Sequence, residues 1–564
     1  MKKHITRLLF AALLLLALCI GASAAGTSGK CGPSAYWSFD SSTGTLTISG
    51  SGAMNDYEYG DYPWMDYRDS IQTIVIGDQI TQIGRYAFTG TACSTIKFGK
   101  NVRSIGERAF LECRNLNGDL TLPDSVQTIG AGAFQGCEKL SGDLTIPDSV
   151  VEIGEGAFRD CKNLNGTLTL GKNLRTIGKE AFSGCAFTGS LTIPEGVTEI
   201  ADSAFGAGIP LKKYGMFTGT LTLPSTLKTI GASAFSYADF SGELLIPDGV
   251  TSIGANAFEE CDGFGGTLSL PDSVKTVGEW AFYLCKGFTG LKLSAGLTKI
   301  EKLSFAHMYG LKTEVVIPEG VTEIGESAFQ CSHMPSVRFP STLKKIGKEA
   351  FYFSLNCKIA FPDGLEVIED EAFALCNVKS AVILPASIKS IGKKAFDSDW
   401  SYGKHNDIPL GAYFLGAAPQ LVGTGNANCS FPSDWTLNYL PGTSGWMGDT
   451  YEGYKIVPWD GETRWDNLYT DDFGYRDNKW NKIETSWSVN MDTGKITLTD
   501  DLNEGCAVAV SYDAEGRVTG IGVLRTKTDF VILNLQDTCR LFLLNASSSP
   551  RLDAPVTIND YLPV

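Results

Sequence analysis

One phrase recurs along most of this sequence. The stretch LTLPDSVQTIGAGAFQGC begins at Leu120, and a near copy, LTIPDSVVEIGEGAFRDC, begins at Leu144. Aligned on the L-x-I-P step, fourteen copies follow one another, most of them 22 to 24 residues long. A copy this short cannot bury its own apolar face, but stacked copies bury it continuously. The repeat therefore predicts a solenoid. The copies start at Ile74, Ile96, Leu120, Leu144, Leu168, Leu191, Leu221, Leu244, Leu268, Leu291, Val315, Val337, Ile359 and Val382.

The spacing inside a copy indicates a strand followed by a turn. Leu120 and Leu122 alternate with Thr121, which is the period-two pattern of a strand with one buried face. The Pro-Asp pair that follows turns the chain out of the strand. Ala133 and Phe134 form the most regular pair of the repeat, and they suit either a tight buried turn or one short helical turn. We expect parallel pairing of each strand with the next copy, and so a mostly β fold with short helical turns.

The repeat resembles a known family. LTIPDSVVEIGEGAFRDC and IPDGVTSIGANAFEEC are similar to the BspA-like leucine-rich repeats of bacterial surface proteins, over residues 74–400. The resemblance implies a leucine-rich repeat solenoid with a parallel sheet. It also implies a secreted or cell-surface protein that adheres to host proteins, host cells or other bacteria. It says little about the ligand, because the matching positions are the buried ones.

The regions on either side of the array suggest further segments. Residues 25–73 resemble the cap that opens such arrays, and residues 401–460 resemble the tail that closes them. Caps are expected physically, because an unpaired sheet edge invites aggregation. Residues 461–486 show neither strand alternation nor the repeat, and we interpret them as a linker. Short apolar strands separated by Asp and Gly turns predict a small β-sandwich over residues 487–564.

The N-terminal sequence predicts export. MKKHITRLLFAALLLLALCIGASA has basic residues, then an apolar run from Leu8 to Ile20, then small residues of A-x-A type. We expect residues 1–24 to be a secretory signal peptide and the mature protein to be a monomer that does not insert into a membrane. The formal net charge of −16 argues against nucleic acid and anionic membrane surfaces as partners, because both need concentrated Lys and Arg.

Seven cysteines share one position, three residues after the Phe of their copy. Core packing, a set of disulfides and a metal site are the alternatives, and core packing is favoured because Ala238 and Met308 occupy the same position in other copies. No C-x-x-C pair suggests zinc, so we expect no metal and no cofactor. These cysteines are Cys113, Cys137, Cys161, Cys185, Cys261, Cys285 and Cys376.

The sequence contains no catalytic signature. It has no H-E-x-x-H, no G-x-S-x-G and no phosphate-binding loop, so we expect no enzyme. His307, His333 and His405 are expected to be solvated side chains. The acidic residue after the turn proline recurs with the fold and is interpreted as a turn residue rather than a catalytic carboxylate. These acids are Asp124, Asp148, Glu195, Asp248, Asp272, Glu319 and Asp363.

The outward face of the repeat strands is the candidate ligand surface. It begins rich in hydroxyl groups and becomes basic and apolar further along the array. A β-branched ladder that only stabilises the sheet is the structural alternative. A graded surface of this kind suits an extended partner, either a protein or a glycan. The candidate residues are Thr167, Thr169, Thr192, Thr222, Lys292 and Arg338.

Two functions follow from these observations. The first is an adhesin-like binding protein that recognises a host or bacterial surface protein or glycan through the solenoid face. The alternative is an exported protein that binds or acts on glycans, because seven of the ten Trp lie between Trp400 and Trp487 and aromatic rings stack on sugars.

Overall fold

The computed structural model describes residues 27–206, 216–355, 359–376, 382–397, 411–422, 430–432 and 435–458, and the strands between Trp487 and Thr557. The chain divides into two compact units, Met1–Met334 and Pro335–Val564, and each is described by itself. The expected signal peptide, the insertion PLKKYGM except for its last residue, and the expected linker lie outside the described residues.

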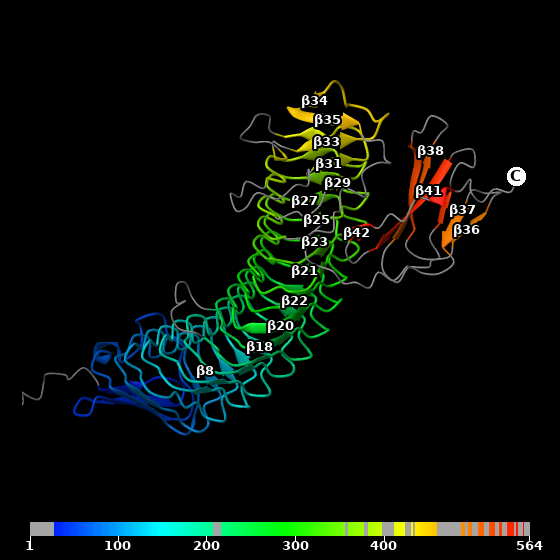
Figure 1. The fold of residues 1–564 in the computed structure, drawn as a ribbon. Coiled ribbons are helices and arrows are strands. Elements are labelled where there is room, and N and C mark those ends of the chain that lie inside the picture. The colour runs from blue at the N-terminus through cyan, green and yellow to red at the C-terminus, as the bar shows by residue number, and fades with distance from the viewer. Residues whose placement is uncertain are drawn as a thin grey trace, which may run out of the picture. The chain divides into compact units, whose positions relative to one another are not determined.

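Each repeat forms one coil of the solenoid, and most copies contribute two short strands. The copies that begin at Leu120 and Ile359 form no strand at the L-x-I step, although the sequence predicts one. In the copy that begins at Leu144, the two strands are β10 (Leu144–Thr145) and β11 (Glu152–Ile153). Both pair in parallel with the next coil, Leu144 opposite Leu168 and Ile153 opposite Ile177. The parallel stacking of coils can be followed in Figure 1 along β18, β20 and β22. The predicted solenoid with a parallel sheet is confirmed. The second strand was not expected, because two residues are too few to show an alternation.

The first strand row of the first unit carries the L-x-I step of the copies that form a strand there. It opens with antiparallel strands β1 to β3, and every described pairing after β3 is parallel. Its strands are β1 (Ser28–Lys30), β2 (Ala35–Asp40), β3 (Thr45–Gly50), β5 (Thr73–Ile76), β7 (Thr95–Lys97), β10, β12 (Leu168–Thr169), β14 (Leu191–Thr192), β16 (Leu221–Thr222), β18 (Gly242–Leu245), β20 (Phe264–Ser269), β22 (Gly290–Lys292) and β24 (Val315–Val316).

Apart from its first strand, Gly52–Ala53, the second strand row carries the Ile or Val that precedes the Ala-Phe turn of each copy. That Ile or Val is buried in every coil of the first unit. The strands of this row in the first unit are β4 (Gly52–Ala53), β6 (Ile80–Ile83), β8 (Ser104–Ile105), β9 (Thr128–Ile129), β11, β13 (Thr176–Ile177), β15 (Glu199–Ile200), β17 (Thr229–Ile230), β19 (Ser252–Ile253), β21 (Thr276–Val277), β23 (Lys299–Ile300) and β25 (Glu323–Ile324).

The third side of each coil is a tight turn around the Ala-Phe pair. The amides of Gly132 and Phe134 donate to the carbonyls of Glu155 and Ala157 in the next coil, both at 2.7 Å. Of the two conformations that the sequence left open, the tight buried turn is the one observed. Within the described residues the one helix is η1, a single 3-10 turn at Met65–Tyr67.

A continuous column of phenylalanines fills the centre of the first unit. Each ring stacks on the ring of the next coil, with centroids 5.1 to 5.7 Å apart, from Phe88 to Phe329. The small residue before each of these Phe is fully buried beside the rings, and it is Ala in every coil except that of Phe305, where it is Ser304. The column explains why Ala-Phe is the most regular pair of the repeat.

The second unit continues the same coil pattern. Phe351, Phe373, Phe396 and Phe431 stack at 5.3 Å. Beyond residue 400, β31, β33 and β35 extend the parallel sheet, and the antiparallel strand β34 pairs with β35 at its end. The strands are β26 (Val337–Arg338), β27 (Lys345–Ile346), β28 (Val367–Ile368), β29 (Val382–Leu384), β30 (Ser390–Ile391), β31 (Gly411–Phe414), β32 (Gln420–Leu421), β33 (Thr436–Tyr439), β34 (Thr450–Tyr451) and β35 (Tyr454–Pro458).

The last segment forms two antiparallel sheets, as expected for a small all-β module. One sheet has the order β36-β37-β40, and the other has the order β39-β38-β41-β42 with β43 on β41. The strands are β36 (Trp487–Asn490), β37 (Lys495–Leu498), β38 (Cys506–Tyr512), β39 (Val518–Leu524), β40 (Phe530–Ile532), β41 (Thr538–Asn545), β42 (Ser549–Pro550) and β43 (Val556–Thr557).

Candidate functional site

The outward positions of the first strand row form an exposed surface on the first unit, which we call the strand face. In β12, Leu168 points into the core and Thr169 points outward, because side chains alternate along a strand. The registers bring outward residues of paired strands side by side, Thr145 with Thr169 and Thr192 with Thr222. The strand face consists of Thr145, Thr169, Thr192, Thr222, Leu245, Ser269, Lys292 and Val316, all exposed.

The strand face changes in character along the array, as the sequence predicts. Leu245 pairs with Ser269, and Ser269 pairs with Lys292. The Leu245 side chain is 72% exposed, so it contributes little to the core. The strand face is therefore rich in hydroxyl groups up to Thr222, and over the next three coils it presents Leu245, Ser269 and Lys292.

Two of the predicted site residues, Thr167 and Arg338, are exposed but are not among the first-unit strand positions that define the strand face. The amide and hydroxyl of Thr167 both donate to Asp143 Oδ1, at 2.6 and 2.9 Å, and these bonds hold the pKa of the Asp143 carboxyl below its usual range. Thr167 therefore joins neighbouring coils instead of presenting a free hydroxyl. Arg338 is exposed on β26, in the second unit. The structure thus brings together Thr169, Thr192, Thr222 and Lys292 on one face of one unit.

The seven repeat cysteines are buried free thiols with a shared hydrogen bond. Each Sγ donates to the carbonyl of the Phe in the preceding coil, at 2.9 to 3.2 Å. Ser332 occupies the same position and donates to the Phe305 carbonyl at 2.7 Å. Burial raises the pKa of the Cys137 and Cys161 thiols, which makes the reactive thiolate scarce. The predicted core packing of these cysteines is confirmed. The sequence analysis missed their role as hydrogen-bond donors, which the hydroxyl of Ser332 at the same position of another copy could have indicated.

The acids that follow the turn proline connect adjacent coils where the structure shows their bonds. Asp148 Oδ1 accepts from the amide of Lys172 at 3.0 Å, and Glu195 Oε1 accepts from the amide of Ser225 at 3.0 Å. The Lys172 side chain lowers the pKa of Asp148, and the Ser225 amide lowers that of Glu195. These carboxylates act structurally, as the turn interpretation predicts.

Comparison with known families agrees with the coil geometry. The model described as "BspA type Leucine rich repeat region (6 copies)" matches residues 62–142, 117–219, 141–264, 213–330 and 288–402, more than half of the chain. The chain belongs to the BspA-type leucine-rich repeat family. No curated protein matches it.

Solved structures of bacterial repeat proteins are similar to this BspA-type chain. A leucine-rich repeat protein from Eubacterium ventriosum ATCC 27560 is 22% identical, with a TM-score of 0.39, and the match covers 68% of this chain and 98% of that one. One from Bacteroides ovatus ATCC 8483 is 22% identical, with a TM-score of 0.37 and coverages of 67% and 93%. A leucine rich cell surface protein from Faecalibacterium prausnitzii A2-165 is 22% identical, with a TM-score of 0.31 and coverages of 70% and 94%.

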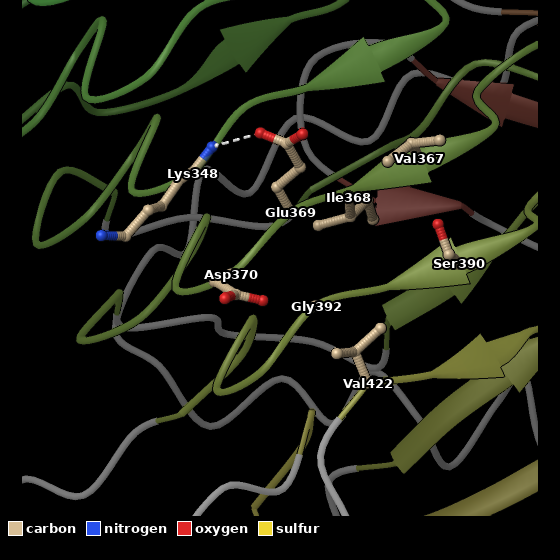
Figure 2. Close-up of a pocket in the computed structure, with 8 residues that line it drawn as sticks. All are labelled: Lys348, Val367, Ile368, Glu369, Asp370, Ser390, Gly392 and Val422. Atoms are coloured by element: carbon tan, nitrogen blue, oxygen red, sulfur yellow. Dashed lines mark hydrogen bonds between the residues drawn. The ribbon is translucent and has the colours of Figure 1, made fainter.

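A pocket of about 350 Å³ lies in the BspA-type coils of the second unit (Figure 2). Its two carboxylates are engaged: Glu369 accepts from the Lys348 amide at 3.1 Å and pairs with Lys345 Nζ at 2.7 Å, and Asp370 accepts from the Lys393 amide at 2.8 Å. Both carboxylates therefore form hydrogen bonds with the backbone of another coil. The pocket is lined by Lys348, Val367, Ile368, Glu369, Asp370, Ser390, Gly392 and Val422.

The aromatic side chains described between residues 411 and 458 are mostly core residues of the BspA-type array. Tyr413, Trp435, Trp446 and Tyr454 are all buried. Trp446 Nε1 donates to the Gly416 carbonyl at 3.2 Å. These rings are not available to stack on a sugar, and the side chains of the other Trp from Trp400 to Trp487 lie outside the described residues.

One prediction about histidine is wrong. His307 is half-buried instead of solvated, and its Nδ1 lies 2.6 Å from the Tyr309 hydroxyl. His333 is exposed, and its ring lies 5.3 Å from that of Tyr309. Tyr309 and His333 each lie four residues after the Phe of their copy. Because equivalent positions of neighbouring copies stack on one another, the sequence could have predicted that these two rings lie close together. His405 lies outside the described residues.

The residues that the structure describes include neither a metal-binding group nor a membrane-spanning helix. Among them, no group of three or more His, Cys, Asp and Glu side chains is arranged to hold a metal ion. Over the same part of the chain, no helix has the length and apolar character needed to cross a bilayer.

Proposed function

We propose that this chain is an exported, non-enzymatic protein of the bacterial surface or its surroundings, which binds a surface protein of a host cell or another bacterium through the strand face. In this proposal residues 1–24 direct export, and residues 25–73 and 401–460 cap the array. Membership of the BspA-type family supports surface binding. The partner is a protein of extended shape, because the strand face is a long row and not a pocket.

One observation carries this proposal: the inward positions are aliphatic in every coil, whereas the outward positions include hydroxyl, aliphatic and basic side chains. Leu168, Leu191 and Leu244 are all buried, yet their outward neighbours are Thr169, Thr192 and Leu245. The fold does not require an exposed leucine in β18. A residue that differs freely at an exposed, regularly spaced position is available for recognition.

The test is adhesion of beads coated with the full chain to monolayers of cultured epithelial cells and to fixed bacteria. The variant L245E/K292E reverses the basic charge and removes the apolar contact on the strand face. We expect it to weaken adhesion by about one to two orders of magnitude, because a few central contacts usually carry about 1–3 kcal/mol. Its melting temperature should change little, because both side chains are exposed.

The matched control places the same charges elsewhere on the first unit. Val151 and Lys275 are exposed and directly precede strands of the second row. V151E/K275E should adhere as the wild type does. Equal loss in both double variants would point to a general charge effect, and undiminished adhesion of L245E/K292E would refute recognition by the strand face.

A further inference from the structure

Aromatic and histidine side chains gather on the turn side of three successive coils of the first unit. Trp280 packs against Tyr283 with ring centroids 4.5 Å apart, and Tyr283 lies 5.1 Å from His307. His307 lies 5.5 Å from Tyr309, and Tyr309 lies 5.3 Å from His333. We call these five residues the ring cluster. They form an unbroken sequence of ring contacts outside the strand face.

The coil fold does not require these rings. Trp280 and His307 have φ values of 61°, in the left-handed region that side chains other than Gly disfavour. The equivalent positions of an earlier coil hold Gly132 and Gly136, at 58° and 71°. Other coils hold Arg108, Glu180 and Leu284 at these positions, also with a positive φ. The turn therefore accepts many kinds of side chain there and does not need the rings in order to form.

The cluster is accessible and held in place. Tyr309 is 40% exposed and His333 is exposed, while Trp280, Tyr283 and His307 are half-buried. The contact between His307 Nδ1 and the Tyr309 hydroxyl orients both rings. Rings that are already ordered lose little conformational freedom when a ligand binds.

Charged groups of both signs lie near the rings. Lys286 Nζ pairs with Asp262 Oδ2 at 2.8 Å. Lys286 influences the titration of His307 and Tyr309, and Glu259 influences that of Tyr283, so these groups share one neighbourhood. Lys286, Asp262 and Glu259 together carry one net negative charge near the rings, which disfavours an anionic ligand. Their polar atoms can form hydrogen bonds with the hydroxyl groups of an uncharged ligand.

The arrangement also indicates a polymer. Neighbouring rings from Tyr283 to His333 are inclined at 80°, 68° and 61°, so faces and edges alternate along the cluster. Coils repeat at about 4.8 Å, the spacing of paired strands. A regular series of rings matches a ligand that itself repeats.

Pyranose rings have an apolar C–H face, which packs on aromatic rings, and a rim of hydroxyl groups, which form hydrogen bonds with polar neighbours. We propose that the ring cluster binds a neutral polysaccharide chain, in a site separate from the strand face.

The experiment is native affinity electrophoresis of the full chain in gels that contain one of four soluble neutral polysaccharides: hydroxyethylcellulose, arabinoxylan, galactomannan or glycogen. We expect at least one of them to retard the wild type. Y283A/Y309A should weaken that retardation by about tenfold or more. The matched control is Y36A/Y59A, which removes two exposed tyrosines of the same unit, 50% and 65% exposed, and should be retarded like the wild type.

Each result decides the proposal. No retardation in any gel, or equal retardation of wild type and Y283A/Y309A, would overturn it. Loss of adhesion to cells by Y283A/Y309A without retardation of the wild type in any gel would assign the cluster to protein docking and also overturn it. If Y283A/Y309A melts at a lower temperature than the wild type, the single variant H333A replaces it, because His333 is exposed and its truncation leaves the core intact.

Discussion

Phe134→Ala tests the stacked core at a single ring. Phe134 is fully buried, and its ring lies 5.2 Å from both Phe110 and Phe158, nearly parallel to each. Truncation of a buried Phe costs about 3–5 kcal/mol through lost burial and the cavity that remains. Two flanking aromatic contacts, each worth about 0.5–1.5 kcal/mol, place this position at the upper end of that range.

The assay is thermal unfolding of the full chain followed by circular dichroism. A unit of this size shifts its melting temperature by roughly 2–4 °C per kcal/mol, so we expect a decrease of about 10 °C or more. Coils contact mainly their neighbours, so hydrogen exchange should increase most in the coils of Phe110 and Phe158. Asp124→Ala is the control, because Asp124 is exposed and should cost little. If both variants melt within a degree or two of the wild type, the rings do not form the core of the array and the coil register is wrong.

Three further predictions address the thiols, the turns and the histidine. Cys137 should resist a thiol reagent in the native chain and react with it in denaturant, and disulfide-bonded repeat cysteines found by mass spectrometry would contradict the buried free thiols. C137S should be more stable than C137A, because the Ser hydroxyl can still donate to the Phe110 carbonyl. Gly136→Ala should cost about 1–2 kcal/mol in chemical denaturation, because φ is 71° there, whereas Glu112→Gly at the same position of the preceding coil should cost nothing. Burial, then Lys286 and His333, lower the pKa of His307 below 6.5, so the imidazole stays neutral in the native chain while it takes up a proton in the unfolded chain. The free energy of unfolding should therefore fall as the pH drops below about 6.5, and His307→Gln should reduce this fall. An ordinary pKa for His307 in an NMR titration would contradict this prediction.

Much of the fold could be predicted because each repeat obeys the same local rules. The side chains of Leu120, Leu122 and Phe134 are buried, and only stacking of the copies can bury them. The second strand row escaped prediction, because Thr128–Ile129 shows no pattern until it pairs with Ser104–Ile105 and Glu152–Ile153. Its existence depends on hydrogen bonds between coils, which a single copy does not contain.

The candidate site also has features that the sequence predicts and features that it does not. Alternation alone placed Thr169, Thr192, Thr222 and Lys292 on the outward face, and the structure exposes all four. It could not show that Thr167 bonds to Asp143, because the two residues belong to different coils.

The sequence by itself determined that this protein is a repeat solenoid, because a repeat of about 23 residues with one apolar face buries that face by stacking on its neighbours. Only the tertiary structure decided which side chains become neighbours across coils. It joined each Cys to the Phe carbonyl of the coil before it, and it brought His307 and His333 to Tyr309. The physical reason is that stacking converts a separation of one repeat along the chain into about 5 Å in space, and no local pattern records which surface residues will then meet.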